Sequence, residues 1–596
     1  MRMQIGEFLI RRLNEAGIRH LFGLPGDFNL SFLEQVEASG TLEFIGNCNE
    51  LNAAYAADGY ARTAGIGALL TTFGVGDLGA ISGIAGAYSE NVPMVHITGA
   101  PPLHSINSRA LLHHTLADGA YGNIGRCMAE FTVAQARITP ANAVTEIDRV
   151  LKACWQERRP VHLQLPSDIT HLSIETPDEP LVLADPASDP GQLERATARI
   201  CAALQEASHP AILIDADAGR FGVADIIQEL SEKCAIPCAS LPPAKGVLDE
   251  STPLYLGTYI GAPTPEATRR AIEQSDCLIG IGLRFTDSST SLFSQRIAPE
   301  ALIDLRRHDL SIGGLPMPGV TLREVLMRVL ENMPARQARP QAASNSTAKT
   351  AATPAVAADS CAANTPLTHA TLWPRIQAFL KPCDVIVGEA GTSNSALGGM
   401  RLPAGASYIS QPVWGAIGYT LPALFGSQVS TPWRRHLLFI GDGSFQLTAQ
   451  ELSSIQRRQL KPIIFLVNNS GYTIERLILG ENSAYNDVAD WNYAGLPQIF
   501  DPSGKALTLV VKDVGELEQA LAQAEQADRL VFIELKLPMM DAPPALPKFA
   551  SIFADFDYGE CGPRNPSASQ PDSAAGTAAP AAGKTQPQSS KDALCL

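Results

Sequence analysis

Two short apolar runs separated by a helical segment constrain this chain more than any other feature. Residues 437–440 and 463–467 are continuously apolar, which predicts two short buried strands. Residues 446–459 between them are rich in Gln, Leu, Glu and Arg and predict a helix. A strand–helix–strand crossover makes its two strands parallel. We therefore expect a parallel α/β domain around this unit.

Residues suited to phosphate and metal binding follow the two predicted strands. They are Gly441, Asp442, Gly443, Ser444, Asn469 and Gly471. Open parallel sheets bind ligands at the carboxyl ends of their strands, and glycines let backbone N–H groups approach an anion. Asp442 would repel a phosphate unless a hard cation lay between them, and Mg²⁺ accepts oxygens from Asp442, Asn469 and the Gly471 carbonyl. The alternative is that these residues form two ordinary turns. This alternative is disfavoured because both groups of residues follow a predicted strand and a single predicted helix separates them.

These motifs resemble those of a known enzyme family. Residues 441–443, together with Asn468 and Asn469, are similar to the motif that binds thiamine diphosphate (ThDP) and Mg²⁺ in ThDP-dependent enzymes. The segment 471–475 narrows the resemblance to the 2-oxo acid decarboxylases, the pyruvate and indolepyruvate decarboxylases. Overall similarity is greatest to indolepyruvate and phenylpyruvate decarboxylases, in the segments 49–62, 111–119 and 485–491. The resemblance covers almost all of residues 1–550. It implies non-oxidative decarboxylation of a 2-oxo acid to an aldehyde and CO₂, through an ylide and an enamine of ThDP.

Alternating strands and helices predict an α/β fold of three doubly wound, parallel-sheet domains. We place these domains at residues 1–180, 190–335 and 367–550. The first and last share a similar order of turns, helices and strands. The resemblance implies that these two are the pyrimidine-binding and diphosphate-binding domains, with a middle domain between them.

Two segments of biased composition lie outside these domains. Residues 336–366 are rich in Ala, Ser, Thr, Pro and Gln, which predicts a flexible interdomain linker. Residues 559–596 are low in complexity and cannot bury enough apolar surface to offset the entropy of ordering, so we expect a disordered tail.

Composition excludes several classes of partner. A net charge of −16 argues against nucleic acid, because phosphate binding needs clustered Lys and Arg. The sequence contains no apolar run of the length that a membrane span requires, and we expect no membrane partner. The eleven cysteines are scattered without zinc spacing, which favours reduced thiols in a cytoplasmic protein. The resemblance implies that the partner is a small 2-oxo acid substrate.

Glu50 is the first candidate catalytic residue. It follows a predicted strand and begins a predicted helix, where the helix dipole favours a carboxylate even without a catalytic role. Residues 49–53 closely match the family motif, however. The resemblance implies that Glu50 hydrogen-bonds N1′ of the aminopyrimidine and promotes removal of the thiazolium C2 proton.

Adjacent histidines at 113 and 114 are the second candidate. Both cannot lie on the core face of a regular element, so one solvated and one buried histidine is the structural alternative. The resemblance assigns His113, His114, Asp27 and Glu475 to proton transfer during decarboxylation. Taken alone, Asp27 would be an ordinary turn residue. Which group delivers each proton is not decided by the sequence.

Residues 414–419 resemble the segment that holds the cofactor in its bent conformation. The resemblance implies that Gly415 offers its carbonyl to the 4′-amino group, that Ile417 is an apolar wedge between the rings, and that Thr392 also contacts the cofactor. Core packing is the alternative for this segment. The resemblance further implies a homodimer or homotetramer with active sites at the dimer interface.

The substrate prediction depends on residues 388–395, which resemble a pocket-lining stretch. Ala390, Asn394 and Ser395 are its candidate pocket residues. Related decarboxylases often carry an aromatic residue near the last two positions, whereas here both are small and polar. A wider pocket favours indole-3-pyruvate or phenylpyruvate as the substrate.

Three alternatives stay open at this point. The substrate could be pyruvate or a branched-chain 2-oxo acid, or the protein could be a ThDP carboligase of the acetolactate synthase type. A catalytically silent α/β scaffold is the third. The histidine pair and Glu475 count against the carboligase. The sequence does not decide the physiological substrate, allosteric activation, the roles of the linker and tail, or dimer against tetramer.

Overall fold

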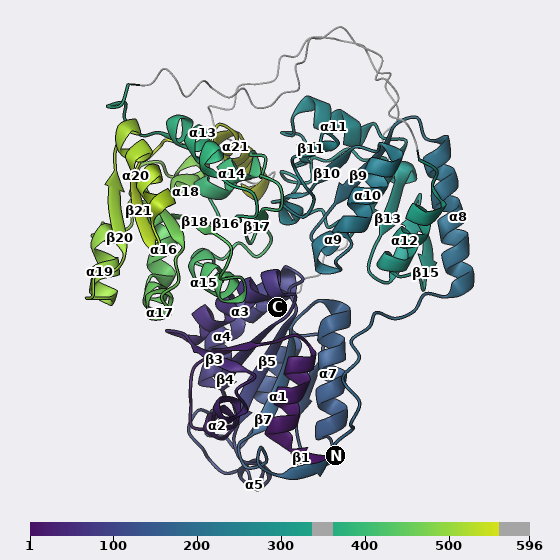
Figure 1. The fold of residues 1–596 in the computed structure, drawn as a ribbon, viewed down its shortest axis with the longest axis vertical. Coiled ribbons are helices and arrows are strands. Elements are labelled where there is room, and N and C mark those ends of the chain that lie inside the picture. The colour runs from purple at the N-terminus through teal and green to yellow at the C-terminus, as the bar shows by residue number, and fades with distance from the viewer. Residues whose placement is uncertain (336–361, 559–596) are drawn as a thin grey trace, which may run out of the picture.

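The computed structural model describes residues 1–335 and 362–558, in which three large sheets are each flanked by helices (Figure 1). Each sheet lies within one of the three predicted domain ranges. A small antiparallel pair, β1 (Arg2–Gln4) with β8 (Ser173–Glu175), is separate from them. Residues 336–361 of the predicted linker and the predicted tail at 559–596 lie outside the described residues.

The N-terminal sheet has six strands, and all neighbours in it are parallel. In order across the sheet they are β3 (Glu43–Gly46), β2 (His20–Gly23), β4 (Gly67–Thr72), β5 (Met94–Ala100), β7 (Val161–Pro166) and β6 (Gln135–Arg137). Successive side chains point to opposite faces, and both faces are buried: Leu69 packs with α3 and α4, and Leu70 packs with α1 and α7. These helices are α1 (Ile5–Glu15), α3 (Glu50–Ala64), α4 (Val75–Ser89) and α7 (Ala143–Glu157).

The C-terminal sheet repeats this plan. Its six parallel strands are β17 (Ser407–Ile409), β16 (Val385–Gly388), β18 (His436–Gly441), β19 (Ile463–Asn468), β21 (Val531–Lys536) and β20 (Leu507–Val511). In both sheets the strands, counted along the chain, lie in the order second, first, third, fourth, sixth, fifth. The predicted similarity of the two domains is therefore confirmed. The flanking helices are α13 (His369–Phe379), α14 (Thr392–Gly398), α15 (Thr420–Ser430), α16 (Asp442–Thr448), α17 (Glu451–Arg457) and α20 (Val514–Gln526).

The middle sheet is parallel except at one edge. Its strands are β11 (Tyr255–Thr258), β10 (Cys238–Ser240), β9 (Pro210–Ile214), β12 (Cys277–Ile281), β13 (Leu302–Leu305), β14 (Asp309–Ile312) and β15 (Leu315–Pro318). The α/β prediction is confirmed, but β14 runs antiparallel to both of its neighbours, β13 and β15. Gly313 and Gly314, with φ of 57° and 76°, form a two-residue hairpin turn that leaves no room for a crossover helix. The flanking helices are α8 (Pro190–Glu206), α9 (Asp217–Arg220), α10 (Ala224–Cys234), α11 (Glu266–Glu273) and α12 (Leu322–Asn332).

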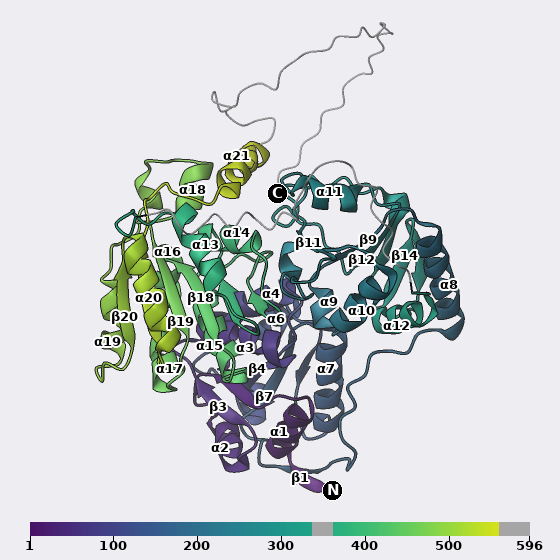
Figure 2. The same ribbon diagram turned by 45° about the horizontal axis from the view of Figure 1, so that its top comes forward.

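The remaining helices lie at the edges of the domains. They are α2 (Leu30–Ser39), α5 (Leu103–Ser108), α6 (Asn123–Ala129), α18 (Thr473–Ile478), α19 (Leu496–Phe500) and α21 (Ala545–Tyr558). Helix α21 extends past the predicted domain end at residue 550 and packs against α18 and α14 (Figure 2). No helix within the described ranges is long and apolar enough to cross a bilayer.

Two sequence predictions about local structure are corrected. The helix expected at 446–459 begins at Asp442 and is divided into α16 and α17, because Leu452 and Ser453 donate to carbonyls only three residues back. Residues 362–366 were predicted to belong to a flexible linker. Instead, the carbonyls of Ala363 and Thr365 accept the N–H groups of Gly515 and Val514, which attaches this segment to the start of α20.

Helices α3 and α15 join the N-terminal and C-terminal domains (Figure 1). A Cβ atom on Gly59 would overlap the Ala423 carbonyl, and one on Gly426 would overlap the Ala56 carbonyl. The two backbones can approach this closely only because both positions are glycine. One hydrophobic cluster consequently continues from the N-terminal sheet, through both helices, into the C-terminal sheet.

This contact can be tested by adding one methyl group. Gly59→Ala forces two backbones apart and should lower the free energy of unfolding by about 1–3 kcal/mol or more, with a lower melting temperature. Gly398→Ala is the matched control, because that helical glycine has no neighbouring atom within 4 Å and an ordinary φ. Equal melting temperatures for the two variants would contradict the close contact.

Candidate active site

The carboxyl ends of β18 and β19 bring Asp442 and Asn469 to one edge of the C-terminal sheet. These strands are parallel neighbours, and Asp442 begins α16 directly after β18. Asp442 is 2% exposed and Asn469 is 4% exposed. The N–H groups of Gly443 and Gly471 donate to the two oxygens of Asp442, over 2.8 Å and 3.1 Å. The structure therefore assembles the predicted Asp442, Asn469 and Gly471 group within one chain.

The electrostatics of this group suit a hard cation. Burial raises the pKa of Asp442 to about 6, although backbone N–H groups act in the opposite direction. No Lys or Arg within the described residues forms an ion pair with this carboxylate. Asn469 Nδ2 donates to Thr473 Oγ1 (2.6 Å), which leaves the amide oxygen as the acceptor toward a ligand. Carboxylate, amide and carbonyl oxygens are the donors that Mg²⁺ accepts, so these residues fit that ion.

Glu389 holds the neighbouring turn, and the sequence analysis missed its importance. It follows β16 and is 1% exposed, and burial raises its pKa to about 7. Its Oε2 accepts hydrogen bonds from Gly418 N–H (3.2 Å) and from the Thr420 hydroxyl (2.6 Å). An acidic residue directly after a buried strand, at the ligand-binding edge of a parallel sheet, was the signal that could have revealed it.

The turn that Glu389 holds contains the predicted residues Gly415 and Ile417. Gly415 has a φ of 65° and Ile417 is 38% exposed. Glu90, at the end of α4, accepts the N–H groups of Val413 (2.8 Å) and Trp414 (3.2 Å). Both ends of the turn are thus fixed by buried carboxylates, while Ile417 stays available for contact with a ligand.

The predicted pocket residues lie at the start of α14. Thr392 is 8% exposed and follows Gly391, whose φ is 103°. Asn394 accepts a hydrogen bond from the Tyr408 hydroxyl, so its side chain is held against β17. Ser395 is partly exposed on the same helix, against which α21 packs. The structure therefore leaves Ser395 freer than Asn394 to contact a substrate.

The N-terminal domain brings together Asp27 and both histidines. His113 Nε2 lies 2.7 Å from Asp27 Oδ2, and His114 Nε2 lies 3.7 Å from Asp27 Oδ1. Phe28 stacks on the His113 ring at 5.1 Å. A Cβ on Gly74 would overlap the His114 carbonyl, so glycine at that position allows the histidine loop to approach the sheet. Three groups able to exchange protons are thus in direct contact.

Glu50 lies nearby on the same domain, at the start of α3. Asn49 caps this helix by accepting the Asn52 N–H (2.8 Å). The Glu50 carboxylate lies beside Gly79 of α4, where an added Cβ would come within 3.2 Å of its Oε2. The small residue on α4 therefore leaves room for the acid, which is partly exposed.

The start of α4 is itself supported by a buried polar cluster. The Asp77 carboxylate caps the helix by accepting the Gly74 N–H (2.8 Å), and it also accepts hydrogen bonds from Thr71 and Thr98. His96 and His162 extend the cluster into the sheet. Burial raises the pKa of Asp77 to about 7. We interpret this cluster as structural support for the turn that contacts the histidine loop.

No hydrogen bond or ion pair within the described residues joins the N-terminal group to the C-terminal group. Glu475 is exposed on α18 and also makes no side-chain contact with Asp27 or the histidines there. Within the described residues of one chain, the two groups are therefore not in direct contact.

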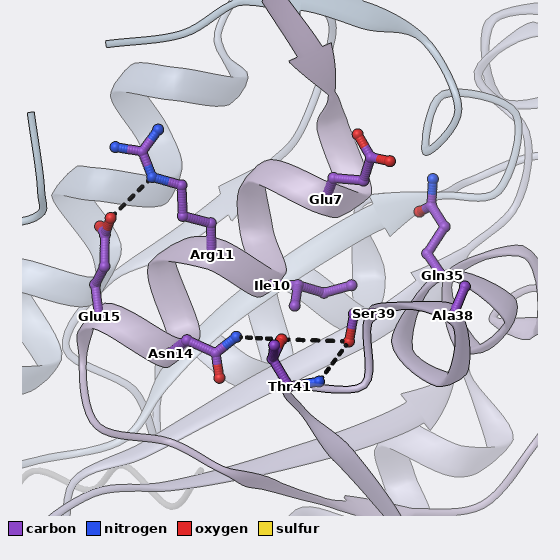
Figure 3. Close-up of a pocket in the computed structure, with 9 residues that line it drawn as sticks. All are labelled: Glu7, Ile10, Arg11, Asn14, Glu15, Gln35, Ala38, Ser39 and Thr41. Carbon is purple, nitrogen blue, oxygen red and sulfur yellow. Dashed lines mark hydrogen bonds and ion pairs between the residues drawn. The ribbon is translucent and has the colours of Figure 1, made fainter. Parts of the chain in front are cut away.

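The cavity in Figure 3 has another location. It measures about 520 Å³ and lies between α1 and the end of α2. Several of its polar groups bind one another, as in the Arg11–Glu15 ion pair and the Asn14–Thr41 hydrogen bond (2.8 Å for each). None of the predicted site residues lines this cavity.

Comparison with known proteins decides the family. Residues 3–120, 197–329 and 389–535 match the N-terminal TPP binding domain, the central domain and the C-terminal TPP binding domain of thiamine pyrophosphate enzymes. An alpha-keto-acid decarboxylase of Mycobacterium ulcerans is 39% identical over 94% of this chain and 97% of its own length. A pyruvate decarboxylase of Aspergillus terreus is also 39% identical, over 91% and 96%.

The chain belongs to the ThDP-dependent 2-oxo acid decarboxylases. The predicted family, enzyme class and cofactor ThDP are thereby confirmed, and Mg²⁺ is the usual partner metal of ThDP in this family. The individual site residues stay predictions. Their placement agrees with a decarboxylase whose cofactor diphosphate lies at the carboxyl edge of the C-terminal sheet.

The metal assignment can be tested by removing Asp442. ThDP with Mg²⁺ at about 100 times its Kd should stabilise the wild-type protein by about 2.7 kcal/mol, seen as a higher melting temperature. Asp442→Ala should lose most of this stabilisation, because the bridging ligand is missing. Chelation of wild type should have the same effect, reversed by Mg²⁺ with ThDP.

Asp528→Ala is the control for this variant, because Asp528 is an exposed acid of the same domain that pairs only with the exposed Lys461. It should respond to ThDP and Mg²⁺ as wild type does. Full stabilisation of Asp442→Ala by the cofactor would refute the metal site.

Proposed function

We propose that this decarboxylase acts on an aromatic 2-oxo acid, either indole-3-pyruvate or phenylpyruvate. The observation that supports the choice is the small, polar pair Asn394 and Ser395 at the start of α14, near Ala390. The Asn394 side chain points toward Tyr408, with which it forms a hydrogen bond, and so it does not project from the helix surface beside Ser395. The names of the relatives extend to pyruvate, so pyruvate is the second candidate.

The residues divide the work as follows. Asp442, Asn469 and the Gly471 carbonyl hold Mg²⁺, and residues 441–444 with Thr392 bind the diphosphate. Gly415 and Ile417 orient the rings of ThDP, which supplies the electron sink that lets a 2-oxo acid lose CO₂. Glu50 holds a proton at N1′ of the aminopyrimidine. This division is supported by the burial, donor types and backbone conformations described above.

Asp27, His113 and His114 exchange protons with the substrate, and Glu475 adds a fourth acid. His113 Nε2 lies 2.7 Å from the Asp27 carboxylate, so these two groups are placed to pass a proton between them. A protonated histidine beside the reacting carbon can donate a proton to it, while a carboxylate can accept one. The contact also argues against the carboligase, whose chemistry does not call for this proton donor.

The active unit in this proposal is a homodimer, or a homotetramer of two such dimers. Exposed apolar side chains lie on the same elements as both half-sites. They are Val75, Leu78, Leu111, Leu116, Trp414, Ile417 and Leu447. A second chain would cover these side chains and bring the Glu50 half of one chain to the Asp442 half of the other. A cytoplasmic location stays a prediction.

Mixing two inactive variants tests the shared site. Glu50→Gln and Asp442→Ala should each be inactive, but a hybrid dimer holds one intact site if the halves come from different chains. An equal mixture after subunit exchange should regain about a quarter of wild-type activity, since half of the dimers are hybrids with one working site each.

A mixture of Glu50→Gln with Asp27→Asn is the matched control, because both changes damage the N-terminal half. No hybrid of these two chains has an intact site, so activity should not return. Absence of rescue in the first mixture, despite proven exchange, would place each site within a single chain.

A substrate panel with Ser395→Phe tests the specificity. An aromatic ring buries about 150–250 Å², and burying half of one at about 25 cal/mol per Å² favours the larger substrate by roughly 2 kcal/mol. This corresponds to about thirtyfold, so kcat/KM for the aromatic acids should exceed that for pyruvate by at least about tenfold. Ser395→Phe should lower the ratio of kcat/KM for the aromatic acids to kcat/KM for pyruvate, mainly by raising KM for the aromatic acids.

Ser395→Ala should leave the ratio unchanged, because it adds no bulk. A higher kcat/KM for pyruvate, or a ratio unaffected by Ser395→Phe, would refute the aromatic specificity while leaving the decarboxylase assignment intact.

A further inference from the structure

Glu451 is a buried carboxylate that the C-terminal domain directs at the N-terminal domain. It begins α17 and is fully buried. Burial raises its pKa, while hydrogen bonds from Asn52, Asn47 and other groups act against this rise. No Lys or Arg of the described residues forms an ion pair with it. A carboxylate buried without a cation is costly unless hydrogen-bond donors surround it, so the identity of those donors is informative.

Three of the donors come from one short segment of the N-terminal domain. Asn47 Nδ2 donates to Glu451 Oε1 over 2.8 Å. Asn52 Nδ2 and the Cys48 N–H donate to Oε2, over 2.8 Å and 3.3 Å. Cys48 Sγ also lies 3.2 Å from the Gln450 carbonyl, just before α17. The segment is therefore attached to the start of α17 on both sides of Glu50, through Asn47 and Cys48 before it and Asn52 after it.

This segment carries Glu50. It connects the end of β3 to the first turn of α3, and Asn52 is fully buried within that turn. Two hydrogen bonds of Asn52 hold this first turn. Its backbone N–H donates to the Asn49 side chain, which caps the helix, and its side chain donates to Glu451 of the C-terminal domain. The Glu50 carboxylate itself faces α4, so Glu451 acts on the backbone that carries the acid and not on the acid directly.

The other end of the same helical unit carries the metal-site carboxylate. Asp442 begins α16, and the chain passes through one tight turn into α17, which Glu451 begins. The segment that carries Glu50 is therefore attached to the same helical unit that begins with Asp442. In a dimer with shared sites, these two residues of one chain serve two different cofactors.

We propose that Glu451 is a positioning residue that holds Glu50 at the aminopyrimidine of the cofactor. This inference rests on the proposed role of Glu50. It adds a residue from outside the site, placed 399 positions from its main partner Asn52 in the sequence.

Glu451→Ala removes all three acceptor contacts and gives two expected results. In the cofactor-free protein, backbone amide exchange of residues 47–52 should rise. In the holoenzyme, exchange of the C2 proton of bound ThDP should fall by about 10²-fold, the cost of displacing a catalytic group by roughly 1 Å. ThDP affinity should be retained, because the metal ligands are untouched.

Two further variants separate this role from a general loss of stability. Glu451→Gln keeps one acceptor oxygen, and Asn47 can turn its amide because its Oδ1 has no partner, so this variant should retain most C2 exchange. Arg458→Gln breaks the Arg458–Glu43 ion pair (2.5 Å), which joins the same two domains beside the segment without contacting it. Arg458→Gln should change neither exchange rate.

A Glu50→Gln background supplies the decisive comparison. If Glu451 acts through Glu50, adding Glu451→Ala to Glu50→Gln should not lower the rate of C2 proton exchange any further. An equal fold reduction of that rate in the wild-type and the Glu50→Gln backgrounds would refute the proposal. Unchanged amide exchange at residues 47–52 would also refute it. Should Glu451→Ala fail to fold, Asn52→Ala removes the main donor instead and should reproduce both effects.

The same set of variants distinguishes failure of the Glu451 proposal from failure of the proposed function. If Glu50→Gln alone retains C2 exchange, the assigned role of Glu50 is wrong. If Glu50→Gln loses exchange while Glu451→Ala keeps it, only the positioning role of Glu451 is wrong.

Discussion

The backbone contact between α3 and α15 is the constraint on which the arrangement of this enzyme depends. Glycines at 59 and 426 let each helix touch a carbonyl of the other, which merges the cores of the N-terminal and C-terminal domains. Close-packed interiors adjust little to added volume, so this contact fixes the relative position of the two sheets. In that arrangement no hydrogen bond or ion pair within the described residues joins the Glu50 half of the chain to the Asp442 half.

Buried carboxylates without cationic partners occur repeatedly at the joints of this structure. Asp442 holds the turn of Gly471, Glu389 holds the turn of Gly415, and Glu451 holds the segment of Glu50. Burial is the main influence on the pKa of each and raises it, and each is compensated by backbone or amide donors. Such groups are expensive unless fully hydrogen-bonded, so each one restricts its surroundings to a single arrangement.

Sequence reasoning predicted local features better than relations between distant segments. Strands β18 and β19 and the turns after them were predicted because a short apolar run followed by glycine has few alternatives. The antiparallel edge at β14 and β15 was not predicted, since a two-residue turn gives a weak signal in a region of alternating strands and helices. Glu389 and Glu451 were also missed, because their roles depend on donors that lie far along the chain.

The sequence by itself determined the α/β class, the cofactor motif around Asp442 and Asn469, and the family of the enzyme. These follow from short-range patterns: apolar runs of strand length, glycines where backbone must approach an anion, and oxygen ligands at strand ends. Only the tertiary structure decided that His113 contacts Asp27 and that Glu451 accepts hydrogen bonds from the segment that carries Glu50. Those relations depend on how whole domains pack, and packing is set by the shapes of many side chains together, which no single motif encodes.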